Sequence, residues 1–215
     1  GGNLDQLVRE HRPSARWSVE LLARLARAMQ LAHDLGVVHR DLKPANVLLV
    51  DIDGETVGSK SSSHSSRSGT MPPVIGRSSL AEVAPAVVPK IADFGLARDL
   101  NSEDTQTITG QVIGTASFMS PEQASGMRAS PAADVYSLGA ILYFLLTGHP
   151  PLEGGSPLET LLMVQQSEPP PLARHRPGLS AELNVICLKC LEKDPARRYG
   201  SALLLAEDLR RFLNG

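Results

Sequence analysis

The sequence has few cysteines and shows no metal-ligand pattern built on them. Its 215 residues contain two cysteines, Cys187 and Cys190, in a single CxxC. A structural zinc site needs four ligands, and no second Cys or His pair stands at a suitable spacing. We therefore interpret both as small apolar residues one helical turn apart. Because nothing suggests a disulfide framework, the sequence predicts a protein of the reducing cytoplasm.

Excess charge and long hydrophobic runs are also missing, and each absence excludes a class of partner. The net charge is −2 and charged residues make up 20% of the chain, so no field favours nucleic acid or anionic lipid. The longest apolar run, Val135–Leu146, is shorter than the roughly 20 residues that a membrane helix needs. No signal-peptide pattern is visible. We expect no nucleic-acid partner and no membrane segment in this chain.

Most of the chain carries apolar residues at helical spacing, and its length suits one domain. The predicted helices are a short one at Leu4–Val8, one N-capped by Ser18 and closed by Gly36, Pro131–Leu146, Leu158–Gln166, Ala181–Glu192, and a last one N-capped by Ser201. Short extended pieces are expected at Val37–Val38 and Val47–Val50. The predicted fold class is mostly α, α+β overall, with a few short strands around one loop.

Two segments break this periodicity. Residues 58–79 are dominated by Ser, Gly and Arg, and such a composition cannot bury enough surface to offset its ordering entropy. We therefore expect a disordered Ser-rich surface insertion over residues 54–86. Residues 99–114 are polar and rich in Thr, which is typical of a mobile loop.

Three motifs carry the chemistry of the sequence. They are His39–Asn46, which reads HRDLKPAN and precedes the apolar run Val47–Val50, then Asp93–Gly95 (DFG), and Ser120–Glu122 (SPE). A lone Asp-x-Lys would usually be a solvated pair, but eight loop residues, a DFG and their order form a specific set. The set resembles the signature of the protein kinase family. The resemblance covers nearly the whole chain and implies the helical C-terminal lobe of the kinase fold.

The resemblance implies a phosphoryl-transfer site, which needs positioned metal ions and a group that orients the attacking hydroxyl. Asp41 matches the catalytic base, and Lys43 matches the lysine that meets the transferred phosphate in serine/threonine kinases. Asn46 and Asp93 match the metal ligands, and hard oxygen donors suit Mg²⁺. Leu48 resembles the residue under the adenine ring, so Lys43, Asn46, Leu48 and Asp93 are the expected nucleotide-binding residues. The implied cofactors are ATP and Mg²⁺, with Mn²⁺ as an alternative.

Other matches are catalytic support, structural or regulatory. Thr115 matches a threonine that bonds the catalytic Asp and Lys. The structural and regulatory positions of the family are matched by His39, Arg40, Phe94, Gly95, Glu122, Asp134 and Arg198. His39 is expected to pack beneath Phe94 rather than to carry protons. Asp134 is expected to hold the catalytic loop through its backbone, and Glu122 and Arg198 are expected to form a buried ion pair.

Arg40 suggests regulation. An arginine before the catalytic aspartate usually pairs with a phosphorylated residue of the activation segment, here residues 93–122, through charge-assisted hydrogen bonds. Thr105, Thr107 and Thr109 are the candidate phosphosites. We hypothesise trans-autophosphorylation through transient self-association.

The resemblance covers one lobe only. No GxGxxG, no VAIK-like lysine and no partner glutamate precede the loop. We therefore expect residues 1–215 to be a kinase C-lobe without its N-lobe, a fragment that is inactive by itself.

Three functions stay open. One is a serine/threonine kinase that transfers the γ-phosphoryl group of Mg-ATP to Ser/Thr hydroxyls of proteins. The second is a catalytically inactive, kinase-like binding or scaffold module, against which the intact Asp41, Lys43, Asn46 and Asp93 argue. The third is metal-dependent hydrolysis using His39, Asp41 and Asp93, which explains neither the SPE motif nor the helix pattern.

Overall fold

The computed structural model describes residues 2–51, 87–94 and 115–215. The predicted Ser-rich insertion, Gly95 and the three candidate phosphosites Thr105, Thr107 and Thr109 lie outside the described residues. The expectations for those positions therefore stay predictions.

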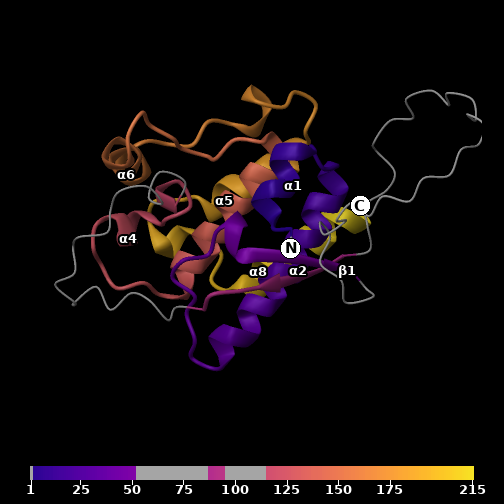
Figure 1. The fold of residues 1–215 in the computed structure, drawn as a ribbon, viewed down its shortest axis with the longest axis horizontal. Coiled ribbons are helices and arrows are strands. Elements are labelled where there is room, and N and C mark those ends of the chain that lie inside the picture. The colour runs from indigo at the N-terminus through magenta and orange to yellow at the C-terminus, as the bar shows by residue number, and fades with distance from the viewer. Residues whose placement is uncertain (1, 52–86, 95–114) are drawn as a thin grey trace, which may run out of the picture.

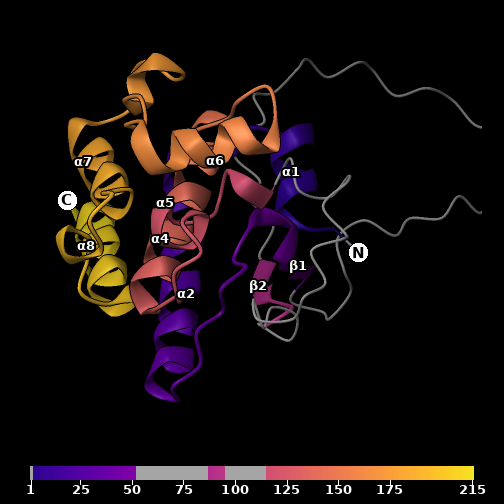
Figure 2. The ribbon, with the colours of Figure 1, turned by 90° about the vertical axis from the view of Figure 1, so that its left-hand side faces the viewer.

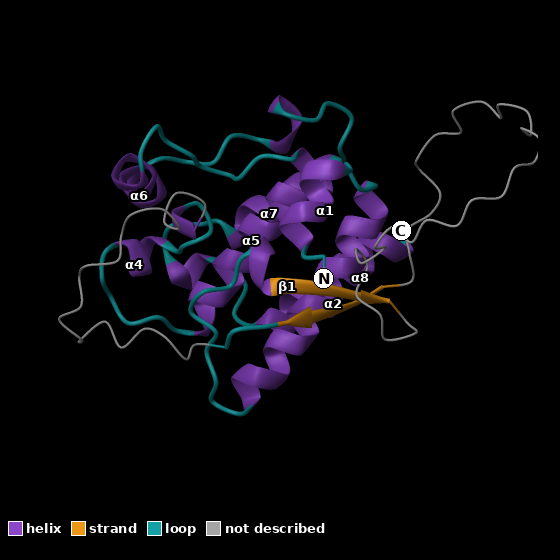
Figure 3. Cartoon of the chain, viewed as in Figure 1, coloured by secondary structure: helices purple, strands orange, loops and turns teal. Residues whose placement is uncertain are grey.

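The described part of the chain is mostly helical, with two short strands beside the helices (Figures 1 and 3). Its α-helices are α1 (Leu4–Glu10), α2 (Ala15–Asp34), α4 (Pro121–Ala124), α5 (Pro131–Thr147), α6 (Pro157–Gln166), α7 (Ala181–Cys190) and α8 (Ala202–Asn214). Single 3-10 turns lie at Pro44–Asn46, Leu172–Arg174 and Pro195–Arg197, and the strands are β1 (Val47–Asp51) and β2 (Val87–Ile91). The predicted fold class is confirmed.

Helix α5 forms the centre of the core. Every residue from Ala133 to Thr147 is buried, because this helix is apolar all round and can be stable only when it is surrounded. Helices α2, α7 and α8 pack against it, and Figure 2 shows α7 and α8 on one side and α1 with the strands on the other. The last turn of α5 ends at Gly148, which adopts the left-handed conformation with φ 78°.

A close approach of α5 and α7 explains one glycine and both cysteines. A Cβ added to Gly139 would overlap the Cβ of Cys190, so the two helices can meet here only without a side chain on α5. Cys187 and Cys190 are fully buried free thiols, and burial raises the pKa of each. The interpretation of these cysteines as small core residues is confirmed.

Two local predictions around α2 are wrong. The helix begins at Ala15 with Ser14 as its N-cap, because the Ser14 hydroxyl accepts a hydrogen bond from the Trp17 amide. Ser18 lies one turn inside the helix, where its hydroxyl donates to the Ser14 carbonyl. At the other end Gly36 closes the helix as predicted, with φ 75°, but Val37–Val38 forms no strand.

The residues after α2 instead complete the helix end. The amides of Gly36 and Val37 donate to the carbonyls of His33 and Ala32, which is the hydrogen-bond pattern of a Schellman motif. Val37 is thereby engaged in closing the helix rather than in a sheet. The chain then turns directly into the loop at His39.

The two strands form an antiparallel pair whose ends fix the site. Val47 pairs with Ile91 and Asp51 with Val87, so the end of the loop at Asn46 lies beside Ala92. The Ala92 amide donates to the Asn46 carbonyl at 2.9 Å, which extends the pairing toward Asp93. The HRDLKPAN loop and the segment Asp93–Phe94 are therefore brought together by the sheet.

One negative finding concerns membranes. Within the described ranges, no helix combines the length and hydropathy needed to cross a bilayer.

Candidate active site

A side chain of α5 holds the start of the loop His39–Asn46. Asp134, in the first turn of α5, is buried and accepts hydrogen bonds from the backbone amides of His39 at 2.9 Å and Arg40 at 3.0 Å. Its Oδ2 also lies 2.8 Å from Nε2 of His33, at the end of α2. One carboxylate thus fixes two successive peptide groups of the loop.

His39 joins the loop to the end of β2. The side chain is fully buried, its Nε2 lies 2.9 Å from the Ala92 carbonyl, and its Nδ1 accepts the Asp41 amide at 3.3 Å. The tautomer with hydrogen on Nε2 satisfies both contacts. The centroids of its ring and the Phe94 ring lie 4.8 Å apart, with the ring planes tilted by 52°. With both ring nitrogens engaged, none remains for a reacting group.

Four predicted residues, Asp41, Lys43, Asn46 and Thr115, form one hydrogen-bonded cluster. The Lys43 Nζ donates to Asp41 Oδ2 at 2.9 Å and to Thr115 Oγ1 at 3.2 Å. The Asn46 Nδ2 donates to the Asp41 carbonyl at 2.9 Å and approaches Asp41 Oδ2 at 3.4 Å. The side chains of Asp41 and Lys43 are 35% and 22% exposed, so solvent can reach the pair. Such a partly exposed pair contributes little to stability.

Asp93 follows the end of β2, one residue after Ala92, whose amide is bonded to Asn46 at the end of the loop. It is exposed and has φ 58°, and Arg40 in the loop has φ 69°. A residue other than glycine in this left-handed region costs about 1–3 kcal/mol and tends to occur at functional sites. Arg40 directly precedes Asp41 in the chain. Asp93 directly follows Ala92, which is bonded to Asn46.

The donor set fits a magnesium ion that is shared with a phosphate ligand. The described residues contain no group of three or more His, Cys, Asp and Glu that could cage a metal. Asn46 and Asp93 offer an amide oxygen and a carboxylate, and Mg²⁺ prefers a few such hard oxygens with water and phosphates completing its shell. Because the Asn46 Nδ2 faces Asp41, Oδ1 is the atom with which Asn46 could bind a cation.

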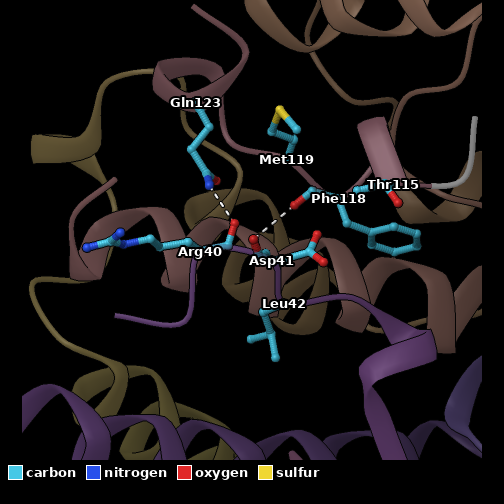
Figure 4. A pocket seen from close by; sticks show the side chains of 8 residues that line it. Arg40, Asp41, Leu42, Thr115, Phe118, Met119 and Gln123 are labelled. Atoms are coloured by element: carbon cyan, nitrogen blue, oxygen red, sulfur yellow. Dashed lines mark hydrogen bonds between the residues drawn. The ribbon is translucent and has the colours of Figure 1, made fainter. Parts of the chain in front are cut away.

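A small pocket opens beside Asp41 (Figure 4). Its lining residues are Arg40, Asp41, Leu42, Thr115, Phe118, Met119, Gln123 and Ser137. In the close-up, Gln123 and Met119 lie on one side of Asp41 and Leu42 on the other. The Ser137 hydroxyl donates to the Phe118 carbonyl at 2.9 Å, which ties this wall to α5. The pocket places the Asp41 carboxylate among both polar and apolar side chains.

Glu122 and Arg198 form the predicted buried pair. Nη1 and Nη2 of Arg198 each donate to one oxygen of Glu122 at 2.7 Å. The other three N–H groups of Arg198 donate to the carbonyls of Glu192, Ala132 and Lys193, so all five donors are used. Burial has the largest single effect and tends to raise the pKa of Glu122. The hydrogen bonds from Arg198, a backbone amide and Ser120, together with the charge of Arg198, outweigh it and hold that pKa below its usual value. Helix α4 is fixed by this pair.

For two further predicted residues, Leu48 and Arg40, the structure gives the position but no side-chain hydrogen bond within the described residues. Leu48 is half-buried in β1, opposite Lys90. The side chain of Arg40 is exposed and has no hydrogen-bond or ion-pair partner within the described residues. Its predicted phosphorylated partners lie outside them.

Two polar contacts were not predicted from the sequence. His33 reaches Asp134, and the Gln123 Nε2 donates to the Arg40 carbonyl at 2.6 Å. His33 gave no signal beyond its place at a helix end. Gln123 stands three residues after Ser120, a Ser-x-x-Gln spacing that predicts a capping box but not a reach across to the loop.

Comparison with known proteins assigns the class. Residues 1–209 match the family described as protein kinase domain, and the chain belongs to this family.

Its similar relatives include bacterial serine/threonine-protein kinases. The chain is 36% identical over 218 residues to serine/threonine-protein kinase PknB of Mycobacterium tuberculosis (strain ATCC 25177 / H37Ra), and 32% identical over 216 residues to PknB of Mycobacterium leprae (strain TN). Each alignment covers 100% of this chain and 29% of the relative. The probable serine/threonine-protein kinase CE0033 of Corynebacterium efficiens is 35% identical over 97% of this chain and 27% of its own length. The chain thus spans less than a third of the curated relatives it matches.

Proposed function

We propose that this chain carries the catalytic residues of a serine/threonine protein kinase that moves the γ-phosphoryl group of Mg-ATP to Ser/Thr hydroxyls of proteins. The observation that carries the proposal is the Lys43 ammonium group placed between Asp41 Oδ2 and Thr115 Oγ1. Membership of the protein kinase family and the names of the relatives support the same activity.

Asp41 acts as the base in this proposal. Lys43 and Asn46 both approach Oδ2, so Oδ1 is the oxygen offered to an incoming hydroxyl. As the hydroxyl oxygen bonds to the γ-phosphorus, the bond from that phosphorus to the β,γ-bridging oxygen breaks and ADP leaves. The hydroxyl proton passes to Asp41. A positioned base of this kind contributes about 10²–10⁴-fold to the rate.

Lys43 and Thr115 position positive charge in this proposal. Phosphoryl transfer is catalysed mainly by positioning and by electrostatic stabilisation of the oxygens of the moving group. Lys43 supplies a cation beside the base, and the Thr115 hydroxyl holds its ammonium group from the far side. Thr115 therefore shares the Lys43 ammonium group with Asp41 and gives it a second fixed partner.

Asn46 and Asp93 would hold the metal. The ion, when bound, neutralises charge on the nucleotide phosphates. The chain's own part is to present Asn46 Oδ1 and the exposed Asp93 carboxylate from two segments that the backbone hydrogen bond from Ala92 to Asn46 holds together. Leu48, half-buried in β1, would lie under the adenine ring.

Activation by phosphorylation belongs to the same proposal. The exposed guanidinium group of Arg40 suits a phosphate on Thr105, Thr107 or Thr109, added by a second copy of the protein. Peptide mapping of an active preparation should find phosphate on at least one of these threonines. An active preparation with no phosphate between residues 99 and 114 would contradict this step.

The experiment that tests the kinase proposal measures where phosphate goes. The complete gene product is incubated with radiolabelled ATP, Mg²⁺ and a Ser/Thr protein substrate, and labelled protein and free phosphate are counted separately. We expect labelled Ser/Thr in the wild type and none in Asp93→Ala, with both proteins equally folded by circular dichroism. Free phosphate without labelled protein, surviving Lys43→Ala, would favour hydrolysis. No turnover in the wild type would favour the inactive scaffold.

A further inference from the structure

Gln123 connects the SPE segment to the catalytic loop. Its Oε1 accepts hydrogen bonds from the Ser120 amide at 3.3 Å and the Ser120 hydroxyl at 3.0 Å. Its Nε2 donates to the Arg40 carbonyl at 2.6 Å. Because the oxygen of the amide is fixed by Ser120, the nitrogen must face Arg40. Figure 4 shows this side chain reaching from α4 to the loop.

Among the described residues, Gln123 is the only one that donates a hydrogen bond to the Arg40 carbonyl. Asp134 binds the Arg40 amide, His39 Nδ1 binds the Asp41 amide and Asn46 binds the Asp41 carbonyl. The peptide between Arg40 and Asp41 follows a left-handed residue with φ 69°, a conformation that persists only where surrounding contacts impose it. Its orientation sets where the Asp41 side chain starts.

We infer that Gln123 is a positioning residue, which sets the Arg40–Asp41 peptide according to the position of α4. Helix α4 is itself fixed by the buried pair of Glu122, the neighbour of Gln123, with Arg198. When α4 is held in place, the side-chain amide of Gln123 therefore fixes the backbone next to Asp41, the proposed base. This inference rests on the proposed function, because it assigns Asp41 as the base.

Two substitutions separate this role from helix capping and from charge. Gln123→Glu keeps an acceptor for Ser120, as in the usual Ser-x-x-Glu capping box, but puts an acceptor in place of the donor facing Arg40. Gln123→Met removes both polar contacts and adds no charge. We expect both to slow single-turnover phosphoryl transfer at saturating ATP by about tenfold, with the KM for ATP unchanged.

Gln165→Glu is the matched control. The Gln165 Nε2 donates to the Ala124 carbonyl at 2.7 Å, so this bond is of the same kind and also ends on α4, but neither of its residues belongs to the loop. We expect Gln165→Glu to keep the wild-type transfer rate. In hydrogen exchange, the Arg40 and Asp41 amides should exchange about threefold faster or more in both Gln123 variants and at the wild-type rate in Gln165→Glu.

Each outcome decides the inference. A capping role alone would leave Gln123→Glu as fast as the wild type, and an effect of charge alone would leave Gln123→Met as fast as the wild type. Either result overturns it. If the wild type transfers no phosphate, the proposed function fails, but the exchange measurement still decides: unchanged exchange in both Gln123 variants shows that Gln123 does not position the loop.

Discussion

At Asp41 the chain sets a carboxylate beside an ammonium group and leaves both partly exposed. An exposed pair of this kind has a median worth of about 0–1 kcal/mol, so its arrangement is poorly explained as a contribution to stability. Three further polar groups hold the two residues: the Thr115 hydroxyl binds the Lys43 ammonium group, and the Asn46 amide and the imidazole of His39 bind the Asp41 backbone. This convergence is more easily understood as preparation for a reaction.

Thr115 offers a test of how Lys43 is held. Thr115→Val keeps the shape but removes the hydroxyl that accepts the Lys43 ammonium group, so we expect phosphoryl transfer by the complete gene product to fall about tenfold. Thr115→Ser keeps the hydroxyl and should stay within about twofold of the wild type. Equal rates in the two variants would show that the hydroxyl does not matter for transfer.

At the scale of elements, helix α4 is too short to be stable by itself and is held by a buried ion pair. The bidentate bond of Glu122 to Arg198 joins it to the segment after α7, and removal of one partner of a buried pair costs about 3–5 kcal/mol. We expect Arg198→Met to lose stability on this scale in urea unfolding at neutral pH. The exposed Arg197→Met, whose nearest carboxylate partner is Glu192 at 3.3 Å, should change it by less than about 1 kcal/mol.

The same pair predicts a pH dependence. The pKa of Glu122 is lower in the folded protein than its ordinary value of 4.5, so the unfolded chain binds a proton more readily. The stability that this group contributes is therefore fully present above about pH 4.5 and is lost as the pH falls through the folded pKa. Stability measured against pH should fall less steeply below pH 4.5 in Glu122→Gln. Identical slopes would contradict this assignment.

The contact of α5 with α7 predicts the effect of one methyl group. Gly139→Ala would drive a Cβ into Cys190, and overpacking of a core typically costs about 1–3 kcal/mol. Gly200→Ala is the matched control, since its Cβ would meet Leu204 Cδ1 at an ordinary 3.7 Å. Urea unfolding should separate the two variants by at least about 1 kcal/mol. A Gly139→Ala protein as stable as the control would mean that the helices can move apart freely.

For the whole molecule, the features that could be predicted from the sequence are those that a local pattern of residues determines. The apolar run of α5 and the Ser201 cap of α8 each depend on neighbouring residues, and both predictions are confirmed. Ser18 was the wrong N-cap because Ser14 stands one turn earlier and competes for the same role. Such a choice between two serines depends on where the preceding chain enters, which local pattern does not fix.

Contacts between distant segments were harder to predict. The bond of Gln123 to Arg40 spans 83 residues and that of His33 to Asp134 spans 101 residues. Neither residue is unusual in its own segment, so only the folded arrangement identifies them. The pair of Glu122 with Arg198 was predicted only because the motifs resemble a known family. Periodicity alone would have left both residues as surface charges.

The proposed role of Asp41 as the base of a phosphoryl-transfer site can be tested with one substitution. In the complete gene product, Asp41→Asn keeps an oxygen for Lys43 but cannot take up the proton, so transfer to a Ser/Thr substrate should fall by at least about two orders of magnitude. Asp34→Asn, which changes an exposed carboxylate that accepts only from Gln30 among the described residues, is the control. Nucleotide affinity should be unchanged in both. Transfer by Asp41→Asn within about twofold of the wild type would show that Asp41 is not the base.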